Sequence, residues 1–218
     1  MFIHCPPKNL QDLESQTLNG KRFYTTPDGK RLPSVTTVLG AKPKPHLLEW
    51  RKRVGEEEAN RITKKSSGRG TNLHQMCEDY VNNKPLSVRM PDALEMFKSL
   101  KPLLHRINNV HYQEQALWSY QLNMAGRVDC IAEFDGELSI IDYKNSRRIK
   151  TREQILDYFH QTTAYALMYE ELIGKPINKL VILMAVEDDE PQLFIENTED
   201  HIHGLVEAIH YYQSTVRD

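Results

Sequence analysis

The hydrophobic pattern of this chain changes its period after Leu104, and this change constrains the fold more than any other feature of the sequence. Before that point, apolar residues recur every three or four positions, as on one face of a helix. The last such stretch carries Leu94, Phe97, Leu100 and Leu104. Beyond it, three segments alternate as strands do: 111–120, 126–134 and 137–144. The switch predicts a mixed α/β domain with an α-helical N-terminal portion.

Helices are expected ahead of these strands. Residues 1–45 look irregular, because prolines and turn residues interrupt them. One helix is expected over about 46–64 and a second over about 71–82, with a break at Ser66-Ser67-Gly68. Pro91 suits the first position of a third helix. The segment from about residue 46 to Leu104 is therefore expected to be mainly helical.

Further elements follow the strands. Thr151-x-x-Gln154 resembles a capping box that opens a helix ending near Gly174. Strands are expected at 179–186 and 192–196, and a helix follows Thr198. The chain of 218 residues is long enough for one domain with a substantial core, and the order of elements gives no reason to divide it.

The amino-acid composition limits the cellular compartments in which the protein is expected. A hydrophobic fraction of 39% and a charged fraction of 27% are typical of soluble globular proteins. The longest apolar run, 181–186, is too short to span a bilayer, and no secretory signal or transit peptide is evident. Three widely spaced cysteines favour a reducing compartment and are too few for an iron–sulfur cluster. We expect no membrane partner and a cytoplasmic location, or the mitochondrial matrix if a presequence is missing.

Basic residues are unevenly distributed along the chain. The net charge of −2 does not by itself predict nucleic-acid binding. Lys and Arg nevertheless cluster in 42–53, 61–69 and 144–152, whereas acid is concentrated in 187–190. Such segregation permits a basic track on a nearly neutral protein. For any one cluster taken alone, a solvated helix face is the favoured interpretation.

Two acidic residues and a lysine stand at the ends of neighbouring predicted strands. Gly126-Arg127-Val128-Asp129 is followed after 12 residues by Asp142-Tyr143-Lys144. Along the second strand, Leu138 and Ile140 share a face with Asp142 and Lys144, so charge continues an apolar stripe. Burying these charges is costly unless they are paired or bind something. A divalent cation with a scissile phosphate meets that need, and so does a plain Asp–Lys ion pair.

The D-x-K pattern alone carries no weight, because the chain contains it twice. Asp28-Gly29-Lys30 lies in a polar turn with no apolar strand leading into it. The Asp142 copy follows such a strand and has Asp129 on the preceding strand of the expected hairpin. Two carboxylates suit a hard divalent cation, which lowers the pKa of water and neutralises developing charge. The sequence therefore favours phosphodiester hydrolysis at the second copy.

These residues resemble the PD-(D/E)xK nuclease superfamily, and within it the RecB-like exonuclease branch of the mitochondrial genome maintenance exonucleases and their phage and bacterial relatives. The segment GRVDCIAEFDGELSIIDYKNS carries most of the likeness. Three shorter pieces occur in the expected order: PSVTTVL from Pro33, GTNLH from Gly70, and Gln161-x-x-x-Tyr165. The resemblance implies a restriction-endonuclease-like core, a central mixed sheet flanked by helices, over 110–218. It also implies a helical, arch-like portion over 45–105 in the same nuclease domain.

The resemblance also implies roles for single residues. The cation ligands would be His74, Asp129, Asp142 and the carbonyl of Tyr143. Lys144 would be the catalytic lysine, and Glu114 would hold a second cation or a metal-bound water. Gln161 and Tyr165, four apart on one helix face, would position the active site or the DNA. Phosphate contacts would come from Ser34, Arg69, Arg127, Ser146 and Arg148.

Each assignment has an alternative within the sequence. His74 alone would more often be a structural histidine, but the Gly70-x-x-x-His74 context and the acids that follow favour metal binding. Glu114 also fits an exposed strand position. Gln154-x-x-x-Tyr158 repeats the spacing of Gln161 and Tyr165 one heptad earlier, and Ser34 fits a simple turn. We choose Gln161 because Ala164 and Tyr165 match the family pattern better.

The implied function is a metal-dependent exonuclease that hydrolyses DNA at single-stranded ends or flaps. The expected cofactor is Mg²⁺ or Mn²⁺, the expected partner is DNA, and the expected state is a monomer. Two alternatives remain: an endonuclease of the same fold, and a non-catalytic DNA-binding module. The second should have lost an acid or the lysine, and this chain has lost neither.

Overall fold

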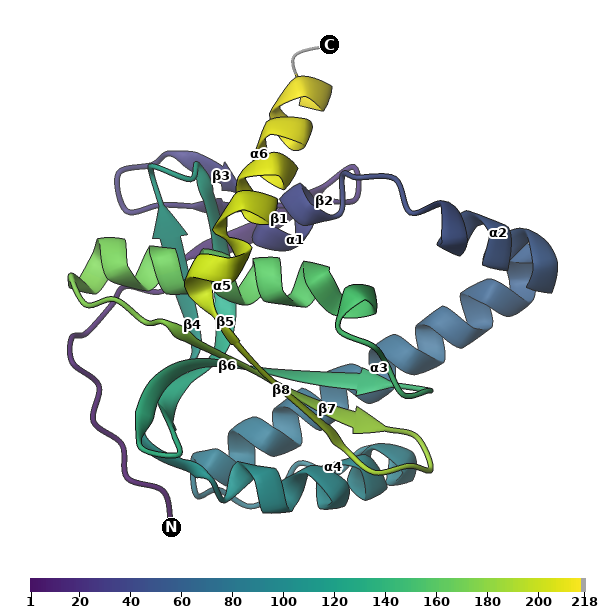
Figure 1. The fold of residues 1–218 in the computed structure, drawn as a ribbon, viewed down its shortest axis with the longest axis horizontal. Coiled ribbons are helices and arrows are strands. Elements are labelled where there is room, and N and C mark those ends of the chain that lie inside the picture. The colour runs from purple at the N-terminus through teal and green to yellow at the C-terminus, as the bar shows by residue number, and fades with distance from the viewer. Residues whose placement is uncertain (217–218) are drawn as a thin grey trace.

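The computed structural model, which describes residues 1–216, has a five-stranded sheet between two layers of helices (Figure 1). The strands are β4 Ile107–Ser119, β5 Met124–Phe134, β6 Glu137–Ser146, β7 Lys179–Val186 and β8 Gln192–Asn197. They lie side by side in that order, with β6 and β7 parallel and the other pairs antiparallel. The predicted mixed α/β fold with a flanked central sheet is confirmed, as are all five strands that the sequence predicted after Leu104.

Alternating residues of β6 show which helices cover each face of the sheet. Ile141 packs with Leu73 and Phe97, from α3 Glu56–Val81 and α4 Pro91–Leu104. Ile140 packs with Met168 and Leu205, from α5 Leu156–Ile173 and α6 Ile202–Val216. The sheet is therefore buried on both faces by opposite sets of alternate side chains.

Several helix boundaries follow from local sequence. Pro91 is the first residue of α4, and its predicted apolar face is buried at Phe97, Leu100 and Leu104 and half-buried at Leu94. A 3₁₀ turn, Glu153–Ile155, precedes α5, and the side-chain oxygen of Gln154 accepts a hydrogen bond from the Thr151 N–H at 3.2 Å, as a capping box requires. Helix α5 ends at Gly174 in the left-handed conformation. A second 3₁₀ turn, Thr198–His201, leads into α6.

The prediction that residues 1–45 are irregular is wrong. They contain a three-stranded antiparallel sheet and a short helix: β1 Glu14–Leu18, β2 Lys21–Thr25, β3 Arg31–Pro33 and α1 Val35–Leu39. Strand β1 is exposed along its whole length, so it carries no apolar alternation. The signal that could have revealed it is Asn19-Gly20, which joins β1 to β2 with positive φ at both residues, as a tight hairpin turn requires.

The predicted helix break at Ser66-Ser67-Gly68 is also wrong. Helix α3 continues through it, and the chain breaks at Gly55 (φ 85°), between α2 Pro45–Val54 and α3. A glycine inside a helix costs about 1 kcal/mol relative to alanine. Burial of Leu73, Met76 and Cys77 along the same helix offsets that cost.

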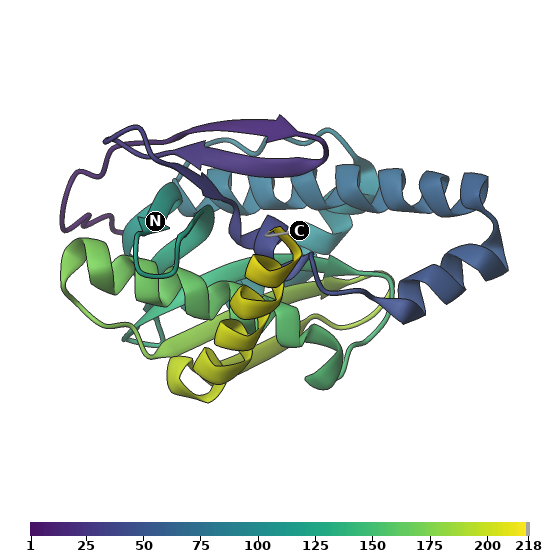
Figure 2. The ribbon, with the colours of Figure 1, turned by 90° about the horizontal axis from the view of Figure 1, so that it is seen from above.

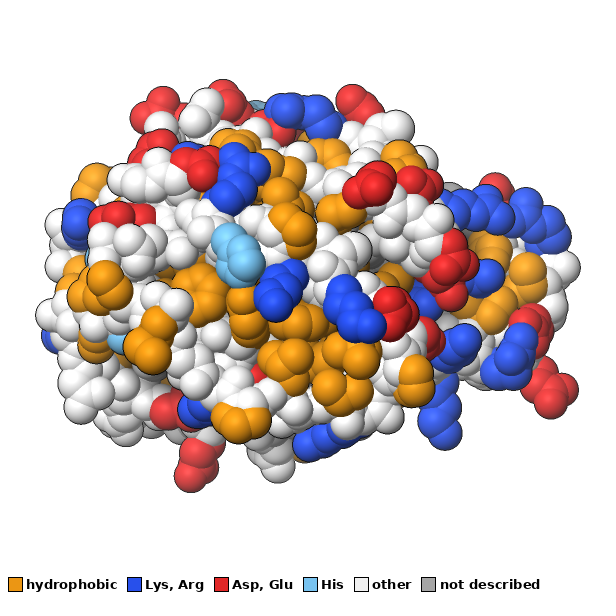
Figure 3. All heavy atoms as spheres, turned by 90° about the horizontal axis from the view of Figure 1, so that it is seen from below, with side chains coloured by type: hydrophobic (Ala, Val, Ile, Leu, Met, Phe, Trp, Pro, Cys, Tyr) orange, Lys and Arg blue, Asp and Glu red, His pale blue; other side chains and the backbone are white. Residues whose placement is uncertain are grey.

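Helix α2 and the first half of α3 form a helical hairpin, residues 45–66, that projects from the body of the molecule (Figures 1 and 2). Lys and Arg side chains gather on this projecting hairpin at the right of Figure 3, with Asp and Glu side chains among them. Within residues 1–216, no helix is both long enough and apolar enough to cross a membrane.

Candidate active site

A cleft of about 450 Å³ opens where α3, α5, β4 and β5 meet. Each of these elements contributes a residue that the sequence singled out: His74 from α3, Glu114 from β4, Asp129 from β5, and Gln161 and Tyr165 from α5. Segments from position 74 to position 165 thus converge on one cleft. The structure brings these five predicted site residues together.

His74, Glu114 and Asp129 form the centre of this cleft. One ligand atom from each lies within 4.8 Å of the others. The Nδ1 atom of His74 is 3.2 Å from Oδ2 of Asp129, and the same oxygen accepts a hydrogen bond from the Tyr143 N–H at 2.8 Å. A nitrogen donor and two carboxylates are suitable ligands for a divalent cation of hard or borderline character.

Strand register and an unusual backbone angle place Glu114 in this group. Strand β4 pairs Gln113 with Cys130 and Gln115 with Val128, so Glu114 stands opposite Asp129. Glu114 has a φ angle of 46°, in the left-handed region that residues other than glycine rarely adopt. Backbone strain of this kind persists only where surrounding structure holds it, and it is concentrated at functional sites.

Asp142 and Lys144 lie beside this group as a buried ion pair. The Nζ atom of Lys144 contacts Oδ2 of Asp142, whose side chain is only 1% exposed. Beyond that contact, neither carboxylate oxygen of Asp142 has a hydrogen-bond partner in the described chain. Leu138 and Ile140 pack toward α5, and Lys144 contacts Gln161 of α5, which confirms the predicted common face.

These residues fit a divalent cation. A buried carboxylate without hydrogen bonds is costly, and a cation relieves the cost by taking an oxygen as ligand. The Oδ1 atom of Asp142 lacks a partner in the described chain, and the cluster of His74, Glu114 and Asp129 supplies further donors. The sequence left open an Asp–Lys ion pair or a cation site. The structure has the ion pair, and it adjoins a group of side chains able to hold a metal.

Burial and neighbouring charge set the protonation of these groups. Burial raises the pKa of Asp142 above its usual value, despite Lys144. Burial acts the same way on Asp129, but the charge and hydrogen bond of His74 and the charge of Lys144 outweigh it and lower the pKa. Burial, and then the charge of Asp129, raise the pKa of Glu114 to about 7. Burial disfavours the charged form of Lys144, but Asp142 and Asp129 outweigh it and raise the pKa, so Lys144 remains a cation.

The Gln161–Tyr165 pair connects α5 to the buried lysine. The Lys144 ammonium donates to Oε1 of Gln161 at 3.4 Å, and Nε2 of Gln161 donates to the Tyr165 hydroxyl at 3.3 Å. A Cβ atom at Gly126 would lie 2.7 Å from the Tyr165 ring, so only glycine admits the ring there. Gln154, the alternative copy, instead caps the start of its own helix.

Tyr158 and Glu78 are two residues of this region that the sequence reasoning did not select. The Lys144 ammonium lies over the Tyr158 ring, 4.8 Å from its centroid. Tyr158 precedes Gln161 by three residues, one turn of α5, and this spacing could have marked it. Glu78 lines the cleft four residues after His74, on the same face of α3.

The five predicted phosphate contacts are dispersed. Ser34 and Arg127 line the cleft; Ser34 also caps α1 by accepting from the Thr37 N–H at 3.0 Å, and Arg127 pairs with Asp12 at 2.6 Å. The other three, Arg69, Ser146 and Arg148, do not line it. The buried Arg69 pairs with Glu187 at 2.8 Å, and the Ser146 hydroxyl donates to the Arg148 carbonyl at 2.6 Å. Their roles toward DNA remain predictions.

Tyr143 contributes its backbone N–H to the site, and its side chain packs with α3 and α4, where its ring lies edge-on to that of His74 with 6.0 Å between centroids. Its N–H orients Asp129. The role of the Tyr143 carbonyl as a cation ligand stays a prediction.

Known proteins resemble this chain in the same region. The model of the PD-(D/E)XK nuclease superfamily matches residues 89–211, more than half of the chain. The chain belongs to this superfamily. The match includes Glu114, Asp129, Asp142, Lys144, Gln161 and Tyr165, whereas His74 lies outside it. The predicted family is confirmed.

Mitochondrial genome maintenance exonuclease 1 of Homo sapiens is 29% identical over 174 residues, which cover 73% of this chain and 51% of the human protein. The Xenopus tropicalis protein of the same name is 27% identical over 176 residues, which cover 73% of this chain and 50% of the Xenopus protein. The chain thus spans about half the length of these relatives. A crystal structure from Eubacterium rectale, described as a candidate exonuclease, covers 68% of each chain with 9% identity and a TM-score of 0.46.

Proposed function

We propose that this member of the nuclease superfamily is a metal-dependent exonuclease that hydrolyses phosphodiester bonds of DNA at single-stranded ends or flaps. The observation that carries the proposal is the grouping of His74, Glu114 and Asp129 within 4.8 Å, beside the buried Asp142–Lys144 pair. The exonuclease names of the relatives support the same direction. DNA replication, recombination, repair and degradation are the processes that such an activity serves.

The cation ligands would be side chains of His74, Asp129 and Asp142, with the Tyr143 carbonyl, and Glu114 would join them or hold a second ion. Mg²⁺ and Mn²⁺ suit the carboxylates, and Mn²⁺ accepts the imidazole well. When bound, such a cation supplies Lewis-acid chemistry and neutralises negative charge on the phosphate.

Lys144 would stabilise charge that develops on the scissile phosphate. It remains protonated because Asp142 and Asp129 outweigh the effect of burial on its pKa. Its ammonium donates to Gln161 at 3.4 Å and lies 4.8 Å from the centroid of the Tyr158 ring. A cation held in advance at the reacting centre stabilises a transition state without reorganisation at the moment of reaction.

A single strand of DNA would reach the cleft along the projecting hairpin of residues 45–66. This hairpin continues into the half of α3 that carries His74, and its basic side chains would neutralise phosphates. We further propose that the protein acts as a monomer, in the cytoplasm of a bacterial or phage-infected cell or in the mitochondrial matrix.

The test is digestion of end-labelled single-stranded DNA, linear and covalently closed, with Mg²⁺, Mn²⁺ or Ca²⁺. We expect linear strands to be degraded with Mg²⁺ or Mn²⁺, and Ca²⁺ to support binding without turnover. Closed circles should resist, because an exonuclease needs an end. Equal cleavage of circles would favour an endonuclease of the same fold, and undiminished cleavage in excess EDTA would exclude the metal-dependent mechanism.

A further inference from the structure

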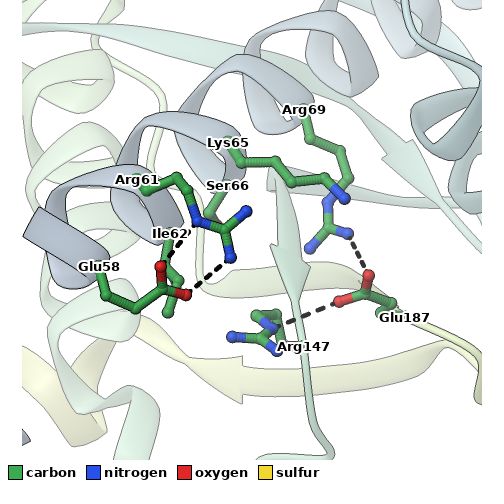
Figure 4. Close-up of a pocket in the computed structure, with 8 residues that line it drawn as sticks. All are labelled: Glu58, Arg61, Ile62, Lys65, Ser66, Arg69, Arg147 and Glu187. Carbon is green, nitrogen blue, oxygen red and sulfur yellow. Dashed lines mark hydrogen bonds and ion pairs between the residues drawn. The ribbon is translucent and has the colours of Figure 1, made fainter. Parts of the chain in front are cut away.

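A second, smaller cavity of about 150 Å³ lies outside the catalytic cleft, between α3 and the ends of β6 and β7 (Figure 4). Four cationic side chains line it: Arg61, Lys65, Arg69 and Arg147. Two carboxylates, Glu58 and Glu187, line it as well. The lining therefore has an excess of two positive charges.

The ion pairs within this cavity leave two of the cations weakly engaged. Arg61 is held by two bonds of 2.7 Å to Glu58, and Arg69 lies 2.8 Å from Glu187. By contrast, Arg147 is 3.6 Å from Glu187, and Lys65 is 3.7 Å from the carboxylate of Asp92, which lies outside the cavity lining. The Lys65 and Arg147 side chains are each 60% exposed, so both are free to turn toward an anion.

Arg69 gives the cavity a fixed cationic wall. Its side chain is only 2% exposed, which is rare for arginine, and its Nε has no hydrogen-bond partner in the described chain. Figure 4 shows its guanidinium directed away from the helix toward Glu187, between Lys65 and Arg147. Guanidinium and ammonium groups arranged around a small cavity match the charge and donor pattern that a phosphate requires.

The cavity adjoins the catalytic strand. Arg147 follows Lys144 by three residues on and just beyond β6, about 10 Å of extended chain. Asn145, the neighbour of Lys144, donates from Nδ2 to the Ser66 carbonyl at 3.2 Å and so ties this part of α3 to β6. An anion in the cavity would thus sit a short distance from the scissile bond, at the base of the projecting hairpin.

We propose that this cavity binds a backbone phosphate of the nucleic-acid strand whose neighbouring bond lies in the cleft, with Lys65 and Arg147 as its mobile contacts. The inference rests on the proposed nuclease function for the nature of the strand. The proposal predicts one phosphate contact that is separate from the metal site and does not require the cleavage reaction.

The test compares the salt dependence of DNA binding between variants of a Lys144→Ala parent, in which cleavage is slowed roughly 10²-fold or more. The pocket variant adds Lys65→Gln and Arg147→Gln; the matched control adds Lys84→Gln and Lys175→Gln, two exposed lysines beyond the far ends of α3 and α5. Affinity for a fluorescein-labelled oligothymidylate is measured between about 50 and 200 mM salt. We expect the log–log slope of the pocket variant to be shallower by about 0.7, one single-strand phosphate, and that of the control to match the parent.

An unchanged slope in the pocket variant, or an equal change in the control, overturns the proposal. If inorganic phosphate stabilises the protein but the slope of DNA binding is unchanged in the pocket variant, the cavity binds free phosphate. That result would also overturn the proposal. Cleavage of the same oligonucleotide by the chain with Lys144 intact, in Mn²⁺, is recorded in parallel. A chain that does not cleave refutes the proposed function, whereas the binding slopes still decide the cavity.

Discussion

The two D-x-K segments of this chain have the same pattern and opposite environments. Asp28 is exposed in the turn between β2 and β3, where it accepts hydrogen bonds from Thr26 and, at 2.8 Å, from the Tyr120 hydroxyl. Asp142 is 1% exposed and has Lys144 as its partner. Hydrogen bonding, from Thr26 first, lowers the pKa of Asp28, whereas burial raises the pKa of Asp142. The comparison teaches that the strand and its neighbours, and not the three-residue pattern, create a buried carboxylate–lysine pair.

The largest effect is expected from Lys144→Ala. We expect a rate loss of roughly 10²-fold or more, on the order of 3 kcal/mol, because an ammonium held against developing charge is removed. Mn²⁺ and DNA affinity should persist in this variant, whereas Asp142→Ala should lose Mn²⁺ binding. Calorimetry with both variants checks this, and normal Mn²⁺ binding by both would show that the ligands are misassigned.

A smaller effect is expected from Tyr158→Leu, which removes the ring beneath the Lys144 ammonium. A cation–π contact contributes about 0.5 to 2 kcal/mol, so kcat should fall roughly 2- to 30-fold with little change in KM. Tyr158→Phe retains the ring and should retain most of the activity. The Asp28 copy has a similar contact, Lys30 over Tyr120 at 5.6 Å, so Tyr120→Leu serves as the matched control with normal kcat. Equal losses in both leucine variants would argue against a positioning role.

The third prediction concerns pH and the metal-free protein. Burial first, and then Asp129, raise the pKa of Glu114 from 4.5 to about 7, so the folded state holds a proton that the unfolded state releases. This contribution to stability is complete below pH 4.5 and is lost as the pH rises through 7. In EDTA, the melting temperature of Glu114→Gln should therefore fall less between pH 5 and pH 8 than that of the unaltered protein. Identical pH profiles would contradict the raised pKa.

The smallest effect is expected from Asp28→Ala and Lys30→Ala. Both residues lie in a turn that the backbone bond from the Gly29 N–H to the Thr26 carbonyl, 2.8 Å, already closes. Activity should stay near normal, with a slight fall in melting temperature for Asp28→Ala because two hydrogen bonds are lost. Loss of metal-dependent cleavage with the fold intact would mean that the wrong copy had been chosen.

Local patterns in the sequence were sufficient for much of the fold. The five-stranded sheet, helix α4 and the strand that ends in Asp142 and Lys144 follow from apolar periodicity, because alternation at period 2 or 3.6 is a property of neighbouring residues. The placement of the acid on β5 near the D-x-K segment follows from the short hairpin between β5 and β6. Local signals failed where an element is exposed, as in β1, or where burial sustains a helix through Gly68.

Only the tertiary structure decided which of the candidate side chains meet. Whether Gln161 or Gln154 reaches Lys144 depends on how α5 is rotated against the sheet. Glu114 reaches Asp129 through the register of β4 and a left-handed backbone angle, neither of which a single strand encodes. Such contacts join residues far apart in the chain, and their geometry is fixed by the packing of whole elements. The sequence therefore predicted the residues of the candidate site, and the fold determined their arrangement.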